Sequence, residues 1–284
     1  MLEAWQAAVL GIVEGVTEYL PISSTGHLIL VSSLMGLSAD DETWRAANTF
    51  NIVIQAGAIA AVLGLYRVRV KQMTLGLIGR DESGRRLAVN LVVAFLPAAA
   101  LGPILSDTIE KFLFNEWPVV GALFAGAWLM LAVAYSRKLA GRARSGHGIN
   151  EVNWKIALMI GFGQCLAMWP GTSRSMMTIV TALMLGLRPR AAAEFSFLLG
   201  LITLTAATGF KLVTGGSQMF DQFGMSAVLI GLVTATVSAV FAVKWFVALI
   251  TRYGLAPFGW YRLILATVVA GMILMGWIKV PEVL

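Results

Sequence analysis

Long apolar runs dominate the chain, and short polar segments separate them. Because roughly 20 apolar residues span the hydrocarbon core of a bilayer as a helix, each uninterrupted run of about this length is a candidate membrane span. Six such runs occur, at residues 50–66, 87–106, 117–136, 192–214, 226–249 and 262–279. The pattern predicts an all-α polytopic membrane protein with six transmembrane helices.

Two further apolar stretches differ from these, because each is broken near its middle. Residues 4–36 are interrupted at LPISSTGH, and residues 154–187 are interrupted at WPGTSRS. Each break contains a proline and hydroxyl side chains, and it leaves backbone N–H and C=O groups without helical partners. Such backbone is tolerated at membrane depth only where protein or a water-filled cavity surrounds it. We therefore predict two re-entrant helical hairpins.

The order of elements repeats as hairpin, three spans, hairpin, three spans. RAANTF (45–50) resembles RAAAEF (190–195), and GIVEGVTEYLP resembles GFGQCLAMWP, which places Glu14 opposite Gln164. Three crossings are an odd number, so the second half must enter from the opposite side, as in an inverted-topology repeat. The chain is predicted to be one integral membrane domain, with pseudo-repeats at 1–136 and 154–279.

Composition and charge support this class and predict an orientation. Only 13% of the 284 residues are charged, whereas soluble domains carry about 25%. The sequence contains no stripe of basic residues interleaved with aromatic residues, so it gives no indication of nucleic-acid binding. Lys and Arg concentrate at 67–86 and 137–153, whereas 107–116 holds one Lys and 215–225 none. The positive-inside rule places the two basic loops in the cytoplasm, which puts both termini and the mouth of the first hairpin outside.

Two carboxylates precede the first break. Ionisable side chains inside a membrane are hypotheses of function by default, and Glu14 and Glu18, four residues apart, share a helical face. Adjacent carboxylates repel unless a proton or a cation lies between them, and oxygen ligands suit Mg²⁺ or Ca²⁺. The alternative is a protonated or hydrogen-bonded pair that packs helices.

Hydroxyl and imidazole groups follow within the same break. Ser24 and His27 are three residues apart, so the histidine could act as a base for a serine nucleophile or protonate a leaving group. The hydroxyls of Ser23 and Thr25 could equally satisfy the broken backbone, and His27 could simply pack against an interface.

The second break places Arg174 between Ser173 and Ser175. A buried arginine requires an anionic partner, and its planar fork suits phosphate oxygens. A salt bridge to Glu14 or Glu18 is the structural alternative. Carboxylates for a cation, an arginine for an anion and a nucleophile with a proton carrier together indicate phosphoryl transfer, in which charge neutralisation supplies most of the catalysis.

The two breaks resemble the motifs of a known family. EGVTEYLPISSTGH (14–27), PGTSRSMMT (170–178) and EFSFLLG (194–200) are similar to motifs of the undecaprenyl-pyrophosphate phosphatases of the bacitracin-resistance type. The resemblance covers nearly the whole chain. It implies a multi-pass enzyme of the bacterial inner membrane that uses a divalent cation and opens to the periplasm. Its substrate would be a polyprenyl diphosphate, hydrolysed to the monophosphate carrier of peptidoglycan synthesis. The family fold, six spans with two re-entrant helix pairs in an inverted repeat, agrees with the pattern above.

The resemblance also implies roles for single residues. Glu14 and Glu18 match the acidic positions that hold the cation or position water. Ser24 matches the proposed nucleophile, His27 matches a histidine proposed as acid, base or alternative nucleophile, and Arg174 matches the arginine that binds the diphosphate. The polar neighbours expected to contact substrate are Ser23, Thr25, Ser173, Ser175 and Thr178.

Two other functional classes remain alternatives at this stage. A transporter or flippase of an anionic isoprenoid lipid would use the same inverted architecture, but it would need no nucleophile. A non-catalytic membrane scaffold would tolerate apolar residues at Glu14, Glu18 and Arg174. The sequence leaves open the identity of the cation, the preferred isoprenoid length and whether the protein forms a homodimer.

Overall fold

The structure, a computed structural model, describes residues 2–38, 40–113, 115–136 and 146–277. Within these ranges the regular structure is helical, apart from an isolated bridge between His147 and Leu187. Five of the described helices are long and apolar enough to cross a membrane, judged by length and composition. The all-α class is confirmed, and the long apolar helices are those of a polytopic membrane protein.

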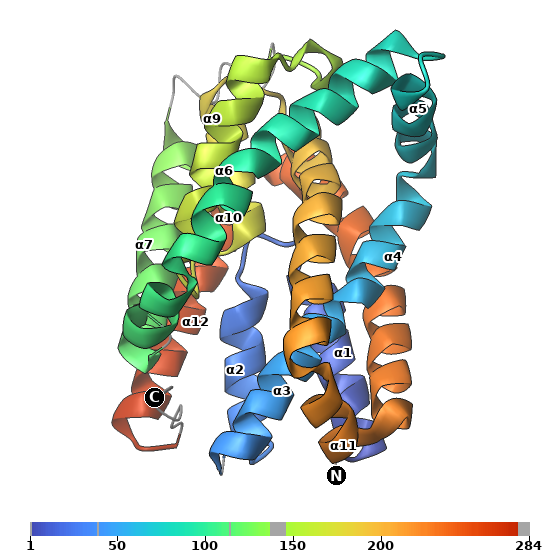
Figure 1. The fold of residues 1–284 in the computed structure, drawn as a ribbon. Coiled ribbons are helices and arrows are strands. Elements are labelled where there is room, and N and C mark those ends of the chain that lie inside the picture. Colours follow the sequence, from blue (N-terminus) through green and yellow to red (C-terminus); the bar gives the residue numbers. More distant parts are fainter. Residues whose placement is uncertain (1, 39, 114, 137–145, 278–284) are drawn as a thin grey trace.

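The elements follow one another along the chain without a strand between them in the described ranges. They are α1 (Ala4–Thr17), α2 (Ser24–Leu34), α3 (Asp41–Val53), α4 (Gln55–Leu65), α5 (Arg67–Leu77), α6 (Glu82–Leu113), α7 (Glu116–Tyr135), η1 (Ile149–Glu151), α9 (Trp154–Cys165), η2 (Leu166–Met168), α10 (Arg174–Met184), α11 (Pro189–Tyr253) and α12 (Ala256–Leu274). In Figure 1, α1 and α2 lie at the same end of the bundle as the end of α12, whereas α9 lies at the opposite end.

Two segments that the sequence pattern predicts to be loops are helical. Residues 215–225 belong to α11, which is interrupted only at Gly224, with φ 74° and ψ 160°. The neighbouring Gly-Gly pair does not end the helix, because only Gly224 uses the left-handed region that glycine permits. Figure 1 shows the chain reversing direction in this part of α11. Likewise α5 fills most of 67–86, since RVRVKQMTLGL contains no proline; residues 137–145 of the other basic loop lie outside the described residues.

Glycines on α1 let this helix approach α11 closely. A Cβ atom added to Gly11 would collide with the carbonyl oxygen of Gly231, and one added to Gly15 would collide with that of Ala235. Small residues at such spacing allow helix backbones to meet in membranes. The contact lies within the chain, so these glycines join α1 to α11.

The two breaks have the same backbone form. Ser23 (φ 72°, ψ 95°) and Ser173 (φ 76°, ψ 115°) are the non-glycine residues with positive φ in the described chain. Each is the N-cap of the next helix, and each hydroxyl accepts a backbone N–H three residues on, from Gly26 (3.2 Å) and Met176 (3.3 Å). A positive φ costs an L-residue roughly 1–2 kcal/mol, so the surrounding structure must enforce it at both places.

Candidate active site

The two breaks meet inside the protein. Ser175 Oγ donates a hydrogen bond to the carbonyl oxygen of Leu20 at 2.7 Å. Arg174 Nη2 donates to Glu18 Oε1 at 2.8 Å. The residues that follow α1 and those at the start of α10 are therefore in direct contact, although more than half of the chain separates them in sequence.

Glu18 is the centre of this contact. One carboxylate oxygen accepts from Arg174, and the other, Oε2, accepts from Ser24 Oγ at 2.6 Å. The side chains of Glu18 and Arg174 are only 6% and 13% exposed. Breaking a buried ion pair by removing one partner costs about 3–5 kcal/mol, so this pair holds the two breaks together. It also gives the Ser24 hydroxyl a carboxylate acceptor.

His27 is held by groups other than Ser24. Its Nδ1 lies 2.7 Å from the carbonyl oxygen of Ser23, and its Nε2 lies 2.7 Å from the hydroxyl of Tyr261. A carbonyl can only accept, so Nδ1 carries the proton. In the neutral ring Nε2 is then the acceptor, and Tyr261 donates to it. Among the hydrogen bonds of the described residues none joins Ser24 to His27; the serine is paired with Glu18 instead.

Two of the three guanidinium nitrogens of Arg174 donate hydrogen bonds to protein, and the third, Nε, does not. Its Nη1 donates to the carbonyl oxygen of Ser196 at 3.1 Å, and its guanidinium lies over the ring of Tyr19, with 5.4 Å from Cζ to the ring centroid. Nε is buried and has no hydrogen-bond partner. Gly200 leaves room for the group, because a Cβ atom there would lie 2.6 Å from Nη1. The salt bridge expected as an alternative exists, to Glu18.

Glu14 is a buried carboxyl group to which no N–H or O–H group of the described residues donates a hydrogen bond. Its oxygens lie within hydrogen-bonding reach of the Glu18 carboxyl, so the two groups can share a proton. Glu14 lies near enough to Glu18 and Arg174 to interact with both electrostatically. An unpaired buried carboxylate is costly, so this position calls for a proton or a cation. The described residues contain no cluster of three or more His, Cys, Asp or Glu side chains that could hold a metal. Two carboxylates fit a hard cation that keeps water or substrate oxygens as further ligands.

The remaining predicted residues lie around this centre but are mostly engaged by protein. Ser173 Oγ lies 3.0 Å from Ser175 Oγ, and Thr178 Oγ1 lies 2.6 Å from Ser196 Oγ. Ser175 and Thr178 are fully buried, and their hydroxyls brace the second break. Thr25 is half-buried at the start of α2. Contact of these residues with substrate stays a prediction.

Sequence reasoning missed three side chains that contact the predicted site. Tyr19 and Ser196 lie inside the quoted motifs EGVTEYLPISSTGH and EFSFLLG, so a signal for them was present. Tyr261 lies 234 positions from its partner His27, and no local pattern connects the two residues.

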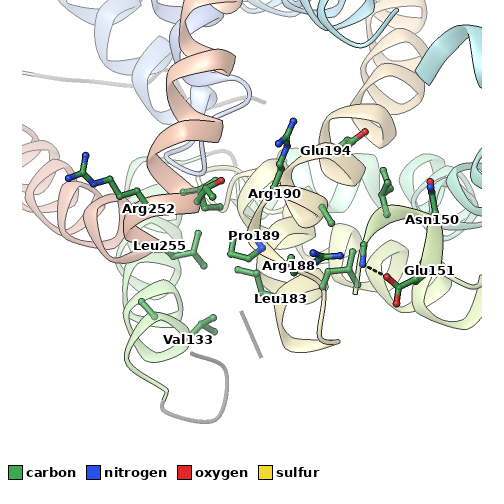
Figure 2. A pocket seen from close by; sticks show the side chains of 18 of the residues that line it. Val133, Asn150, Glu151, Leu183, Arg188, Pro189, Arg190, Glu194, Arg252 and Leu255 are labelled. Carbon is green, nitrogen blue, oxygen red and sulfur yellow. Dashed lines mark hydrogen bonds between the residues drawn. The ribbon is translucent and has the colours of Figure 1, made fainter. Parts of the chain in front are cut away.

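A separate cavity of about 750 Å³ lies between α5, α7, α10 and α11. Arg69 in its wall is paired with Glu194 at 2.7 Å. Figure 2 shows the other labelled arginines, Arg188, Arg190 and Arg252, pointing in different directions rather than toward one point. The cavity contains none of the residues of the breaks. The serine and arginine that converge on one carboxylate lie at the breaks, so we place the candidate active site there.

Comparison with known proteins decides the family. Residues 7–268, which include both breaks, match the family described as bacitracin resistance protein BacA. The chain belongs to the BacA family. Similar BacA-family relatives include the undecaprenyl-diphosphatase of Sorangium cellulosum, 44% identical over 93% of this chain and 85% of that protein. That of Pseudomonas putida GB-1 is 38% identical over 97% and 96%, and that of Azotobacter vinelandii is 41% identical over 92% of each.

Proposed function

We propose that this BacA-family chain is an undecaprenyl-diphosphatase, an integral membrane enzyme that hydrolyses undecaprenyl diphosphate to undecaprenyl phosphate and inorganic phosphate. Its relatives carry this activity in their names. The observation that carries the proposal in this chain is the Glu18 carboxylate, which binds a serine hydroxyl on one oxygen and an arginine on the other. A transporter would need the anion-binding arginine but not the activated hydroxyl.

The arrangement supports attack by Ser24 on the terminal phosphorus. Glu18 accepts the hydroxyl proton as the Ser24 Oγ–P bond forms, and the P–O bond of the anhydride breaks to release undecaprenyl phosphate. Water then hydrolyses the phosphoserine and releases inorganic phosphate. Positioning and charge neutralisation dominate such transfers, and Arg174 supplies a guanidinium with an unengaged Nε donor.

His27 is proposed to carry a proton rather than to activate Ser24. Its Nδ1–H is fixed by the carbonyl of Ser23, so Nε2 is the basic nitrogen of the neutral ring. Proton exchange at Nε2 would involve Tyr261, the group that faces it.

A divalent cation, Mg²⁺ or Ca²⁺, is proposed to bind Glu14 and Glu18 in place of a proton shared between the two carboxyl groups, since no protein N–H or O–H group donates to the Glu14 oxygens. When bound, the cation would neutralise negative charge on the diphosphate. The same two carboxylates could not both stay ionised next to each other without a positive charge between them.

The finer topology is proposed on the same basis. If α3 and α4 form one span and α11 forms two that meet at Gly224, then α6, α7 and α12 complete six crossings, with α1–α2 and α9–α10 as re-entrant pairs. The matching caps at Ser23 and Ser173 support an inverted repeat. The basic residues of α5 lie at the end of the bundle opposite α1 in Figure 1. By the positive-inside rule, this supports an inner-membrane orientation with the first hairpin open to the periplasm.

The test is phosphate release from undecaprenyl diphosphate by purified protein in detergent, with and without a chelator. Ser24→Ala is compared with Thr267→Ala, which removes an exposed hydroxyl bonded only within α12. We expect cation-dependent release by wild type and by Thr267→Ala, and none above background by Ser24→Ala. Absence of release from folded, cation-loaded wild type would contradict the proposal and favour the lipid transporter.

A further inference from the structure

Two consecutive residues of α12, Tyr261 and Arg262, contact both breaks. Tyr261 bonds to His27, the last residue of the first break, and Arg262 bonds to backbone of the second break. Neither residue belongs to the motifs from which the site was predicted.

Arg262 is fully buried and pairs with no carboxylate in the described part of the chain. Its guanidinium donates to the carbonyl oxygens of Gly171 (2.9 Å) and Thr172 (3.1 Å). On α7 it donates to those of Ala122 (3.0 Å) and Leu123 (3.4 Å). Burying an ion costs several kcal/mol unless its donors are satisfied, and here four backbone carbonyls satisfy them.

The bonds of Arg262 hold the backbone just before the catalytic arginine. Gly171 has φ 90°, and Ser173, two residues later, has φ 76°. Such backbone has no helical partners of its own and needs protein groups to satisfy it at membrane depth. Room for the guanidinium depends on Gly126 of α7, where an added Cβ atom would collide with Arg262 Nη2.

Tyr261 holds the first break through His27. Its ring lies parallel to the imidazole, with 5.7 Å between centroids and 1° between planes, and its hydroxyl is 2.7 Å from Nε2. Tyr261 is 43% exposed, whereas His27 is 9% exposed. The tyrosine hydroxyl is therefore the group that stands at the basic nitrogen of the buried ring.

We propose that Tyr261 and Arg262 are positioning residues of the proposed diphosphatase site. Tyr261 fixes the plane of His27 and donates to its basic Nε2, whereas the Ser23 carbonyl fixes the tautomer. Arg262 fixes the backbone that presents Ser173 and Arg174. One turn of α12 thus aligns the catalytic groups of the two breaks. The inference concerns how the site is held, and it rests on the proposed function only for its kinetic tests.

The tautomer is tested without any turnover. The chain has two histidines, so His147→Gln protein labelled with ¹⁵N-histidine reports His27 alone. We expect the Nδ1–H tautomer, with an Nε2 resonance that shifts in Tyr261→Phe but not in Tyr253→Phe, a matched control on another exposed tyrosine. An Nε2–H tautomer, or an Nε2 resonance unchanged by Tyr261→Phe, would overturn the role of Tyr261.

Kinetics test whether that bond positions a working histidine. One hydrogen bond is worth about 1 kcal/mol, or roughly a five-fold rate effect, so Tyr261→Phe should lower kcat about five-fold with KM little changed. In a His27→Gln background the same change should have no further effect. An equal loss in both backgrounds would show that Tyr261 acts independently of His27.

Arg262→Lys tests the second half while keeping the charge. Lysine has three donors on a flexible stem, so it can bond to only part of the carbonyl set, and we expect KM to rise about ten-fold through displacement of Arg174. Arg252→Lys, at an exposed site outside the breaks, should leave KM unchanged. A KM equal to that of wild type in folded Arg262→Lys, judged by its thermal midpoint, would overturn the role of Arg262.

Discussion

In each break a serine with positive φ starts the second helix of a pair, and in each the next residue points into the shared site. After Ser23 that residue is Ser24, bonded to a carboxylate; after Ser173 it is Arg174, bonded to the same carboxylate. Glu14 and Gln164, both buried, each lie nine residues before the positive-φ serine of their break. The backbone is thus the same in both halves while the charges differ, and neither break alone holds a nucleophile, a base and an anion-binding group.

Among changes that separate the two breaks, Arg174→Ala should give the largest effect, because it removes the guanidinium charge that only the second break supplies. Loss of one charge-stabilising group in an active site costs about 10²–10³ in kcat, and the buried Glu18 partner is also left unpaired. We expect phosphate release to fall by roughly 10³-fold, measured as kcat/KM. Arg190→Ala, on an exposed site in RAAAEF, is the control. Wild-type turnover in folded Arg174→Ala would exclude the assigned role.

Glu14→Gln should weaken binding of the divalent cation, because it removes a carboxylate that only the first break supplies. It makes the first break resemble the second, where Gln164 occupies the matching position. We expect the divalent-cation concentration for half-maximal activity to rise at least about ten-fold, a loss typical even of outer-shell partners. Titration of Mg²⁺ and Ca²⁺ after chelation measures this. An unchanged cation concentration for half-maximal activity in Glu14→Gln would show that Glu14 is not part of the cation site. As a control, Gln164→Leu should leave this concentration as in wild type.

Ser23 and Ser173 should respond alike, with the smallest effects. Alanine keeps the cost of positive φ and loses the cap hydrogen bond, which is worth about 1 kcal/mol. Glycine loses the same bond but tolerates the backbone angle. We expect alanine to lower the thermal midpoint more than glycine at both positions, by similar amounts. A milder effect of alanine than of glycine at either serine would contradict the shared strained geometry.

Local features allowed the site to be predicted in outline. Charges inside apolar runs and the prolines of the breaks are visible in the sequence, so Glu18, Ser24 and Arg174 could be chosen before any coordinates. Whether Ser24 faces Glu18 or His27 could not be predicted. His27 is a helical neighbour of Ser24, whereas Glu18 lies across the break, and the observed pairing with Glu18 depends on the turn at the break and on side-chain packing. Arg262 gave a local signal, a charge next to an apolar run, but it is the first residue of the predicted span 262–279, and that position does not indicate that the side chain is buried.

The same division holds for the fold. The helical pairs flanking each break follow from apolar runs interrupted by proline and glycine. The continuity of α11 through residues 215–225 could not be predicted in this way. The segment SQMFDQF is polar and was therefore predicted to be a loop, although it contains ordinary helix formers. The approach of α12 to both breaks required tertiary structure, since no sequence spacing connects Tyr261 with His27.

The central claim is that one carboxylate unites chemistry from the two breaks, and a double-mutant cycle on Glu18 and Arg174 tests it most directly. Phosphate release would be measured for Glu18→Gln, Arg174→Gln, the double variant and wild type, with folding checked by thermal midpoint. Residues that act as a unit are strongly non-additive, so the double variant should be about as slow as the slower single variant. A double variant slowed by the product of the two single effects would show that the groups act independently, and the account of a single shared site would be wrong.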